Sequence, residues 1–171
     1  RVNGITLACP LGPFDRPGSR DLVENKDLRM IWKLSHLKFV AGFASRVESK
    51  EVLKDLSSFV DGIAKDAPSD KPVLTDPVLH PMFEEEMGAA LAQGGEGVLD
   101  DMWAFLDWGF KPEDIEQPVS LFYGGSDEIL SPQMYRDLAE RLPKCSAEEW
   151  PGLGHYSVFA KWAEFLTPLR S

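Results

Sequence analysis

The sequence of 171 residues has few cysteines and no excess of positive charge, and both shortages exclude classes of protein. Its two cysteines, Cys9 and Cys145, lie far apart and form no C-x-x-C pair, so we expect free thiols of a reducing compartment instead of a disulfide framework. The 18 basic residues stand against 28 acidic residues, which gives a net charge of −10. Because this charge repels phosphate groups, we expect no nucleic-acid partner.

A long apolar segment is also missing. The most apolar stretch, residues 30–47, is interrupted by Lys33, His36, Lys38 and Arg46, whereas a membrane-spanning helix needs roughly 20 consecutive apolar residues. No basic segment followed by an apolar one resembles a secretion signal, so we expect a cytoplasmic protein without a membrane span. The chain begins at Arg1 and enters a strand-like run at once, which is typical of a piece of a longer protein.

The periodicity of the apolar residues divides the chain into a sheet portion and a helical portion. Residues 1 to about 10 resemble a strand, and from residue 117 short strand-like runs alternate with helical ones, the last helix being expected over residues 158–169. Between them, apolar side chains recur at helical spacing, with breaks expected near Ser49 and at Ala67-Pro68. We therefore predict an α/β fold in which residues 1–19 and 111–171 form a parallel sheet portion and residues 20–110 form an inserted, mostly helical cap.

Two of the predicted strands end in residues suited to catalysis. One opens into two glycines and then presents Asp127, and the other ends at Trp150, passes Gly152 and Gly154, and presents His155. The carboxyl ends of neighbouring parallel strands share one edge of the sheet, where active sites gather. We therefore predict a hydrogen bond between the imidazole and the Asp127 carboxylate, in which the acid orients the base.

At these loops the sequence resembles the α/β-hydrolase family. Gly124-x-x-Asp127 and Gly152-x-Gly154-His155 look like the acid and histidine loops of its catalytic triad, whose order along the chain is nucleophile, acid, histidine. Further matches resemble the helical cap of the proline-iminopeptidase-like and esterase-like branch: Asp76-Pro77, Gln93-Gly94, Gly97, Asp100 and Trp108-Gly109-Phe110. The resemblance covers essentially the whole chain but only the second half of the family's fold, which implies that an upstream half completes the sheet.

The motif that carries the nucleophile in this family, G-x-S-x-G, does not occur in the sequence. Ser126 lies in the acid loop and lacks the trailing glycine, so we do not expect it to be the nucleophile. The resemblance therefore implies a serine upstream of residue 1, with Asp127 and His155 acting on an ester, an amide or an N-terminal peptide bond of a small-molecule or peptide substrate. Two alternatives stay open: an aspartate nucleophile, as in dehalogenase-like or epoxide-hydrolase-like relatives, and a non-catalytic interaction protein.

Other residues have simpler interpretations. Asp127 is also typical of a turn that bonds nearby backbone groups, and Glu128 is a second choice for the acid. His36 and His80 have no partner at a metal-ligand spacing, so we expect neither a metal site nor a cofactor. Four aromatic residues belong either to a substrate pocket or to the core: Trp103, Phe105, Trp108 and Phe110.

Overall fold

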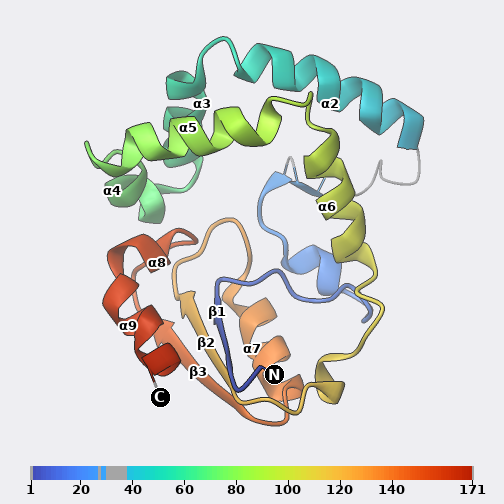
Figure 1. Cartoon of the computed structure of the whole chain (residues 1–171), viewed down its shortest axis with the longest axis vertical. Coiled ribbons are helices and arrows are strands. Elements are labelled where there is room, and N and C mark those ends of the chain that lie inside the picture. The colour runs from blue at the N-terminus through green and yellow to red at the C-terminus, as the bar shows by residue number, and fades with distance from the viewer. Residues whose placement is uncertain (1, 27, 30–37, 171) are drawn as a thin grey trace.

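The computed structural model of the chain describes residues 2–26, 28, 29 and 38–170. Three strands form one parallel sheet in the order β1-β2-β3 (Figure 1). They are β1 (Ile5–Ala8), β2 (Val119–Gly124) and β3 (Cys145–Trp150). The register places Leu7 beside Leu121 and Leu121 beside Ala147. The predicted α/β fold, with parallel strands at the two ends of the chain, is confirmed.

The helices form two groups (Figure 1). Those beside the sheet are η3 (Pro112–Asp114), α7 (Pro132–Arg141), α8 (Ser157–Ala160), α9 (Trp162–Leu166) and η4 (Thr167–Arg170). Those between β1 and η3 along the chain are η1 (Ser19–Leu22), α2 (Lys38–Val52), α3 (Leu56–Asp66), η2 (Pro68–Asp70), α4 (Lys71–Leu74), α5 (Leu79–Leu91) and α6 (Glu96–Leu106). We call this second group the helical segment. Its α4 and α5 lie over the ends to which β2 and β3 point (Figure 1).

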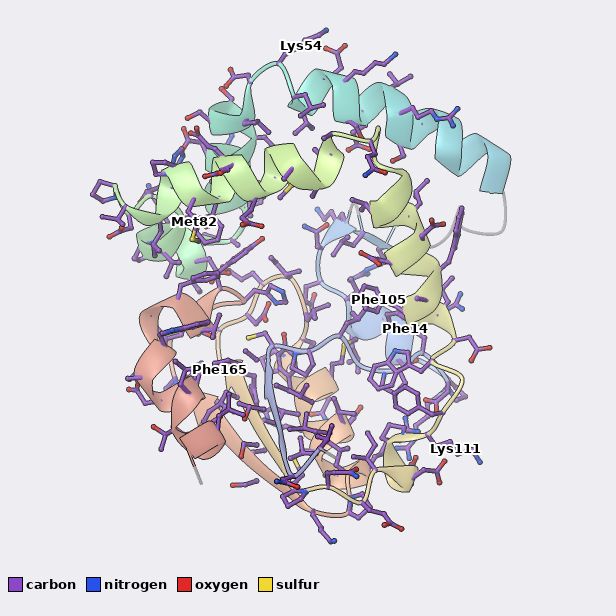
Figure 2. The ribbon with its side chains drawn as sticks, in the orientation of Figure 1. Phe14, Lys54, Met82, Phe105, Lys111 and Phe165 are labelled. Atoms are coloured by element: carbon purple, nitrogen blue, oxygen red, sulfur yellow. The ribbon has the colours of Figure 1, made fainter. Side chains whose placement is uncertain are left out.

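Different helices cover the two faces of β2, as expected for a buried parallel strand. Leu121 and Tyr123 lie on one face and pack against α7 in the main hydrophobic core. Phe122 lies on the other face, where its ring stacks on Trp150 with 5.1 Å between ring centroids. Phe165 of α9 extends toward the same face, with 6.3 Å between its ring centroid and that of Phe122 (Figure 2). The alternation of side chains along one strand therefore builds cores on both sides of the sheet.

A second core joins the helical segment to the sheet portion. Its buried members come from α3, α4 and α5: Val60, Ala64, Leu74 and Phe83. The ring of Tyr156, which follows β3 in the chain, meets Phe83 edge to face with 5.4 Å between centroids. The apolar faces of these helices thus pack beside the loop that carries His155.

Some element boundaries differ from the expectations. The break expected near Ser49 comes after Val52, where α2 ends, and the Ser49 hydroxyl donates to the Ser45 carbonyl at 2.7 Å inside that helix. The helix expected over residues 158–169 is divided at Lys161 into α8 and α9, and η4 follows. In the described part of residues 20–110 no strand forms, and Val23 makes an isolated antiparallel bridge with Leu130. Residues 30–37, which include His36, lie outside the described residues.

Two further expectations concern membranes and thiols. None of the described helices is both long and apolar enough to cross a membrane. Cys9 and Cys145 are free thiols, as expected.

Candidate catalytic site

The acid loop (residues 124–128) and the base loop (residues 151–156) touch because the end of β2 is glycine. A Cβ atom placed on Gly124 would lie 2.1 Å from the carbonyl oxygen of Gly154, which is far closer than atoms can approach. The Ser126 N–H donates to the carbonyl of Leu153 at 2.9 Å and ties the two loops together. The absence of a side chain at Gly124 therefore lets the histidine approach the acid.

Asp127 is fully buried and accepts four hydrogen bonds. Its Oδ1 accepts from the backbone N–H groups of Ile129 at 2.8 Å and Leu130 at 2.9 Å. Its Oδ2 accepts from the Tyr135 hydroxyl at 2.5 Å and from His155 Nδ1 at 2.8 Å. The predicted hydrogen bond between acid and histidine is confirmed. The turn interpretation also holds, since one oxygen forms the turn while the other faces the imidazole.

The electrostatics of the pair keep the acid charged. Burial by itself raises the pKa of Asp127, but the hydrogen bond and charge of His155, with the bonds from Tyr135 and Leu130, outweigh burial and hold the pKa below its ordinary value of 3.8. Burial and the nearby Asp127 charge raise the pKa of Tyr135 far above its ordinary range, so its hydroxyl stays protonated and donates. An ionised carboxylate can only accept, so Nδ1 of His155 carries the proton.

His155 stands at the boundary between the interior and the solvent. Its side chain is 24% exposed, whereas that of Asp127 is 0% exposed. With the proton on Nδ1, the other ring nitrogen, Nε2, is a proton acceptor. In the described part of the chain, no hydrogen bond occupies Nε2. The imidazole is therefore oriented on its buried side and available on the other, as a general base requires.

Two residues that the sequence analysis missed complete the surroundings of the pair. Tyr135, on α7, is fully buried and donates to the same oxygen of Asp127 that faces His155. Asp70, at the end of η2, accepts hydrogen bonds from the backbone N–H groups of His155 and Tyr156. No local pattern singles out either residue, because a tyrosine on a helix and an aspartate after Pro-Ser are common in cores and turns.

Cys9 follows β1 directly and lies beside the pair. Its sulfur, a carboxylate oxygen of Asp127 and a ring nitrogen of His155 all lie within 4.8 Å of one another. Atoms of these types at this spacing can bind a metal ion. The acid and the histidine already bond each other, so their arrangement is explained without an ion. Burial raises the pKa of Cys9 to about 11, which makes its thiol a poor nucleophile at neutral pH.

The other residues considered from the sequence have different positions. Glu128, the second choice for the acid, accepts from the Ser69 N–H at 2.9 Å instead of from the histidine. His80, for which we expected no partner at a metal-ligand spacing, contacts two carboxylates: Nε2 lies 3.4 Å from Asp61, and Nδ1 lies 3.0 Å from Glu84, one helical turn away. The structure records no hydrogen bond between Ser126 and His155 among the described residues.

The aromatic residues considered for a pocket are divided. Trp108 packs against the main core, which supports the core interpretation for this residue. Its ring lies 5.2 Å from that of Phe110, measured between centroids. Phe110 is 53% exposed and Phe105 is 39% exposed, so neither is a buried core residue.

Comparison with solved structures identifies the fold. An esterase from Thermogutta terrifontis matches 99% of this chain with a TM-score of 0.60 and 15% identity, and an esterase from Rhodococcus sp. matches 99% with a TM-score of 0.58 and 14% identity. An α/β-hydrolase enzyme from a Medee basin deep-sea metagenome library matches 97% with a TM-score of 0.57 and 15% identity. No protein-family model matches the sequence, and no curated protein matches it significantly.

In each of these three structures the match covers 55% of the other chain, so this chain spans about half the length of its structural neighbours. The identities are low, and the similarity therefore concerns the arrangement of the strands and helices. It agrees with the resemblance seen at the acid and histidine loops. The chain has a partial α/β-hydrolase fold, consistent with the C-terminal portion of such a protein.

Proposed function

We propose that this chain is the acid-and-base portion of a serine-type α/β hydrolase, with Asp127 as the orienting acid and His155 as the general base. The observation that supports this most directly is the 2.8 Å hydrogen bond between Asp127 Oδ2 and His155 Nδ1. The pair lies at the carboxyl edge of a parallel sheet, which is where this fold places its chemistry.

In the proposed reaction, His155 Nε2 takes the proton of a serine hydroxyl as the serine oxygen attacks the carbonyl carbon of the substrate. The imidazolium then gives this proton to the leaving group, whose bond to the carbonyl carbon breaks and leaves an acyl-serine. A water molecule, which gives a proton to His155 Nε2, then attacks the acyl carbon. The bond to the serine oxygen breaks, the serine takes back the proton, and the acid product is released. Asp127 keeps the Nδ1 proton in place and stabilises the transient positive charge.

The serine and the groups that stabilise the oxyanion are proposed to lie upstream of residue 1. Since β1 pairs only with β2 in the described sheet, its other edge is open to a strand from such a segment. Residues 20–110 would form the cap over the substrate. The substrate class is an ester, an amide or an N-terminal peptide bond, and the names of the structural neighbours favour an ester. The free thiols fit a cytoplasmic location.

The test compares the 171-residue chain with a version extended by the upstream segment of its own gene, on p-nitrophenyl esters and aminoacyl amides. The extended protein should turn over, and the chain alone should not, because it lacks a nucleophile and oxyanion donors. In the extended protein, His155→Ala and Asp127→Asn should each lower kcat by on the order of 10³-fold or more. His80→Ala, on α5 outside the site, serves as the matched control and should leave kcat unchanged.

Three outcomes contradict the proposal. Turnover by the chain alone that survives His155→Ala would place the chemistry elsewhere. An aspartate at the upstream nucleophile position would favour the dehalogenase-like or epoxide-hydrolase-like reaction. An extended protein without turnover on any acyl substrate would favour the non-catalytic alternative.

A further inference from the structure

We propose that Asp70 is a positioning residue, whose buried carboxylate ties the helical segment to the base loop and sets the position of the His155 imidazole against Asp127. This inference rests on the proposed function and adds a group from a distant part of the chain to the acid and base pair. Asp70 precedes His155 by 85 residues and lies at the end of η2.

The contacts of Asp70 are specific for the backbone of the base loop. Its Oδ2 accepts from the His155 N–H at 2.8 Å, and its Oδ1 accepts from the Tyr156 N–H at 2.7 Å. Two charge-assisted bonds to successive N–H groups define both the place and the tilt of the backbone there. Since the imidazole is carried on that backbone, the same bonds restrict how far it can move from Asp127.

The fit around this carboxylate is close. A Cβ atom placed on Gly154 would lie 2.4 Å from Cγ of Asp70, so the base loop approaches the carboxylate as nearly as glycine allows. Gly154 therefore makes two close approaches, one to the Asp70 carboxylate and one to the end of β2 at Gly124. The base loop is held from two sides, by the sheet and by η2.

Filling space alone does not explain a carboxylate at this position. Asp70 is 0% exposed, and a buried carboxylate is costly unless its oxygens are bonded. Burial raises the pKa of Asp70, although the N–H groups of Tyr156 and His155 and the His155 charge counteract it. An apolar side chain of similar size would fill the same space but would leave the N–H groups of His155 and Tyr156 without these acceptors. What only the carboxylate supplies is directional bonding to the base loop and a second negative charge near the imidazole.

The acid loop contacts the same turn from the other direction. Glu128 Oε2 accepts from the N–H of Ser69, the neighbour of Asp70, at 2.9 Å. The η2 turn therefore bonds both loops: its Asp70 carboxylate accepts from backbone N–H groups of the base loop, and its Ser69 N–H donates to a carboxylate of the acid loop. The two loops that carry Asp127 and His155 therefore share one contact in the helical segment.

The decisive experiment measures the Asp127–His155 hydrogen bond without relying on activity. In the 171-residue chain, the Nδ1 proton of His155 should give a strongly deshielded NMR resonance that is absent in His155→Gln. In Asp70→Asn the amide can accept only one of the two backbone bonds, so this resonance should shift upfield or broaden. Asp66→Asn, which changes an exposed carboxylate at the end of α3, is the matched control and should leave the resonance unchanged.

The extended protein supplies the kinetic readout. Asp70→Asn should lower kcat by on the order of 100-fold with KM little changed, as expected when a catalytic group is misplaced by about 1 Å. Gly154→Ala, which pushes the carboxylate aside without removing it, should give the same pattern. If neither variant folds, hydrogen exchange in the unsubstituted chain still tests the two bonds on which the inference depends, because the amides of His155 and Tyr156 should then be strongly protected.

The outcomes separate this inference from the proposed function. Fast exchange of both amides, or a folded Asp70→Asn chain with an unchanged Nδ1 resonance, overturns the positioning role. A changed resonance in an extended protein that hydrolyses nothing supports the positioning role and contradicts only the proposed function.

Discussion

Removing the hydroxyl of Tyr135 should lower the free energy of unfolding, by an amount that depends on whether Asp127 is ionised. Tyr135 is fully buried and donates to Asp127 Oδ2 at 2.5 Å, while its ring stacks on Tyr123 with 5.0 Å between centroids. Tyr135→Phe keeps the ring and deletes only the donor. A buried hydrogen bond to a charged group contributes roughly 1.5–3 kcal/mol. For a chain of this length that corresponds to a fall in Tm of about 3–12 °C at pH 7.

The stability lost in Tyr135→Phe should decrease as the pH falls. The pKa of Asp127 is lower in the folded chain than its ordinary value of 3.8, so the stabilisation from its ionised form is complete above that value and is lost as pH falls through the folded pKa. Tyr135 supplies part of that stabilisation. Once Asp127 is protonated, the remaining bond joins two neutral groups and contributes only about 0.5–1.5 kcal/mol. The free energies of unfolding of Tyr135→Phe and the unsubstituted chain should therefore converge in acid.

The assay is urea unfolding followed by tryptophan fluorescence, from pH 7 down to a pH below the folded pKa of Asp127. The matched control is Tyr123→Phe, whose hydroxyl donates to the solvent-exposed carboxylate of Glu149 at 3.2 Å. Its loss should cost less than about 1 kcal/mol, because exposed polar contacts contribute little. The reasoning is wrong if both variants lose the same stability, or if the deficit of Tyr135→Phe persists unchanged at the acid end.

Three further predictions concern the loops, the thiols and the edge of the sheet. Gly124→Ala should destabilise the chain far more than Gly125→Ala. The methyl group added at Gly124 meets a backbone oxygen 2.1 Å away, whereas the one added at Gly125 meets the end of a flexible glutamate at 2.6 Å. Thermal unfolding of both variants tests this, and equal falls in Tm would contradict it. Iodoacetamide at pH 8 should alkylate Cys145 before Cys9, since Cys9 is 7% exposed and has a pKa of about 11, and mass spectrometry of the two peptides would reveal the opposite order. The chain alone should self-associate through the open edge of β1, and sedimentation velocity over a dilution series that shows only monomer contradicts this expectation.

The features that sequence reasoning missed have both local and tertiary causes. Ser49 lies inside α2, which ends at Val52, and its hydroxyl is satisfied by the carbonyl one turn earlier instead of competing for the backbone. Residues 158–169 contain no strong breaker before Pro168, and periodicity alone predicts one helix. The chain bends at Lys161 because α8 packs against β2 whereas α9 packs against β1, so the two helices run in different directions. The contact between His80 and Glu84 could have been predicted from the sequence, because Glu84 lies one turn along the same helix.

The sequence by itself determined the alternation of strands and helices, the parallel sheet, and the placement of Asp127 and His155 at the ends of adjacent strands. These features depend on periodicity and on residues close together in the chain, which local physics encodes. Tyr135 and Asp70 were decided only by the tertiary structure. Asp70 reaches the base loop across 85 residues, and a contact at that separation depends on how α3, α4 and α5 pack against the sheet portion, which no short pattern specifies.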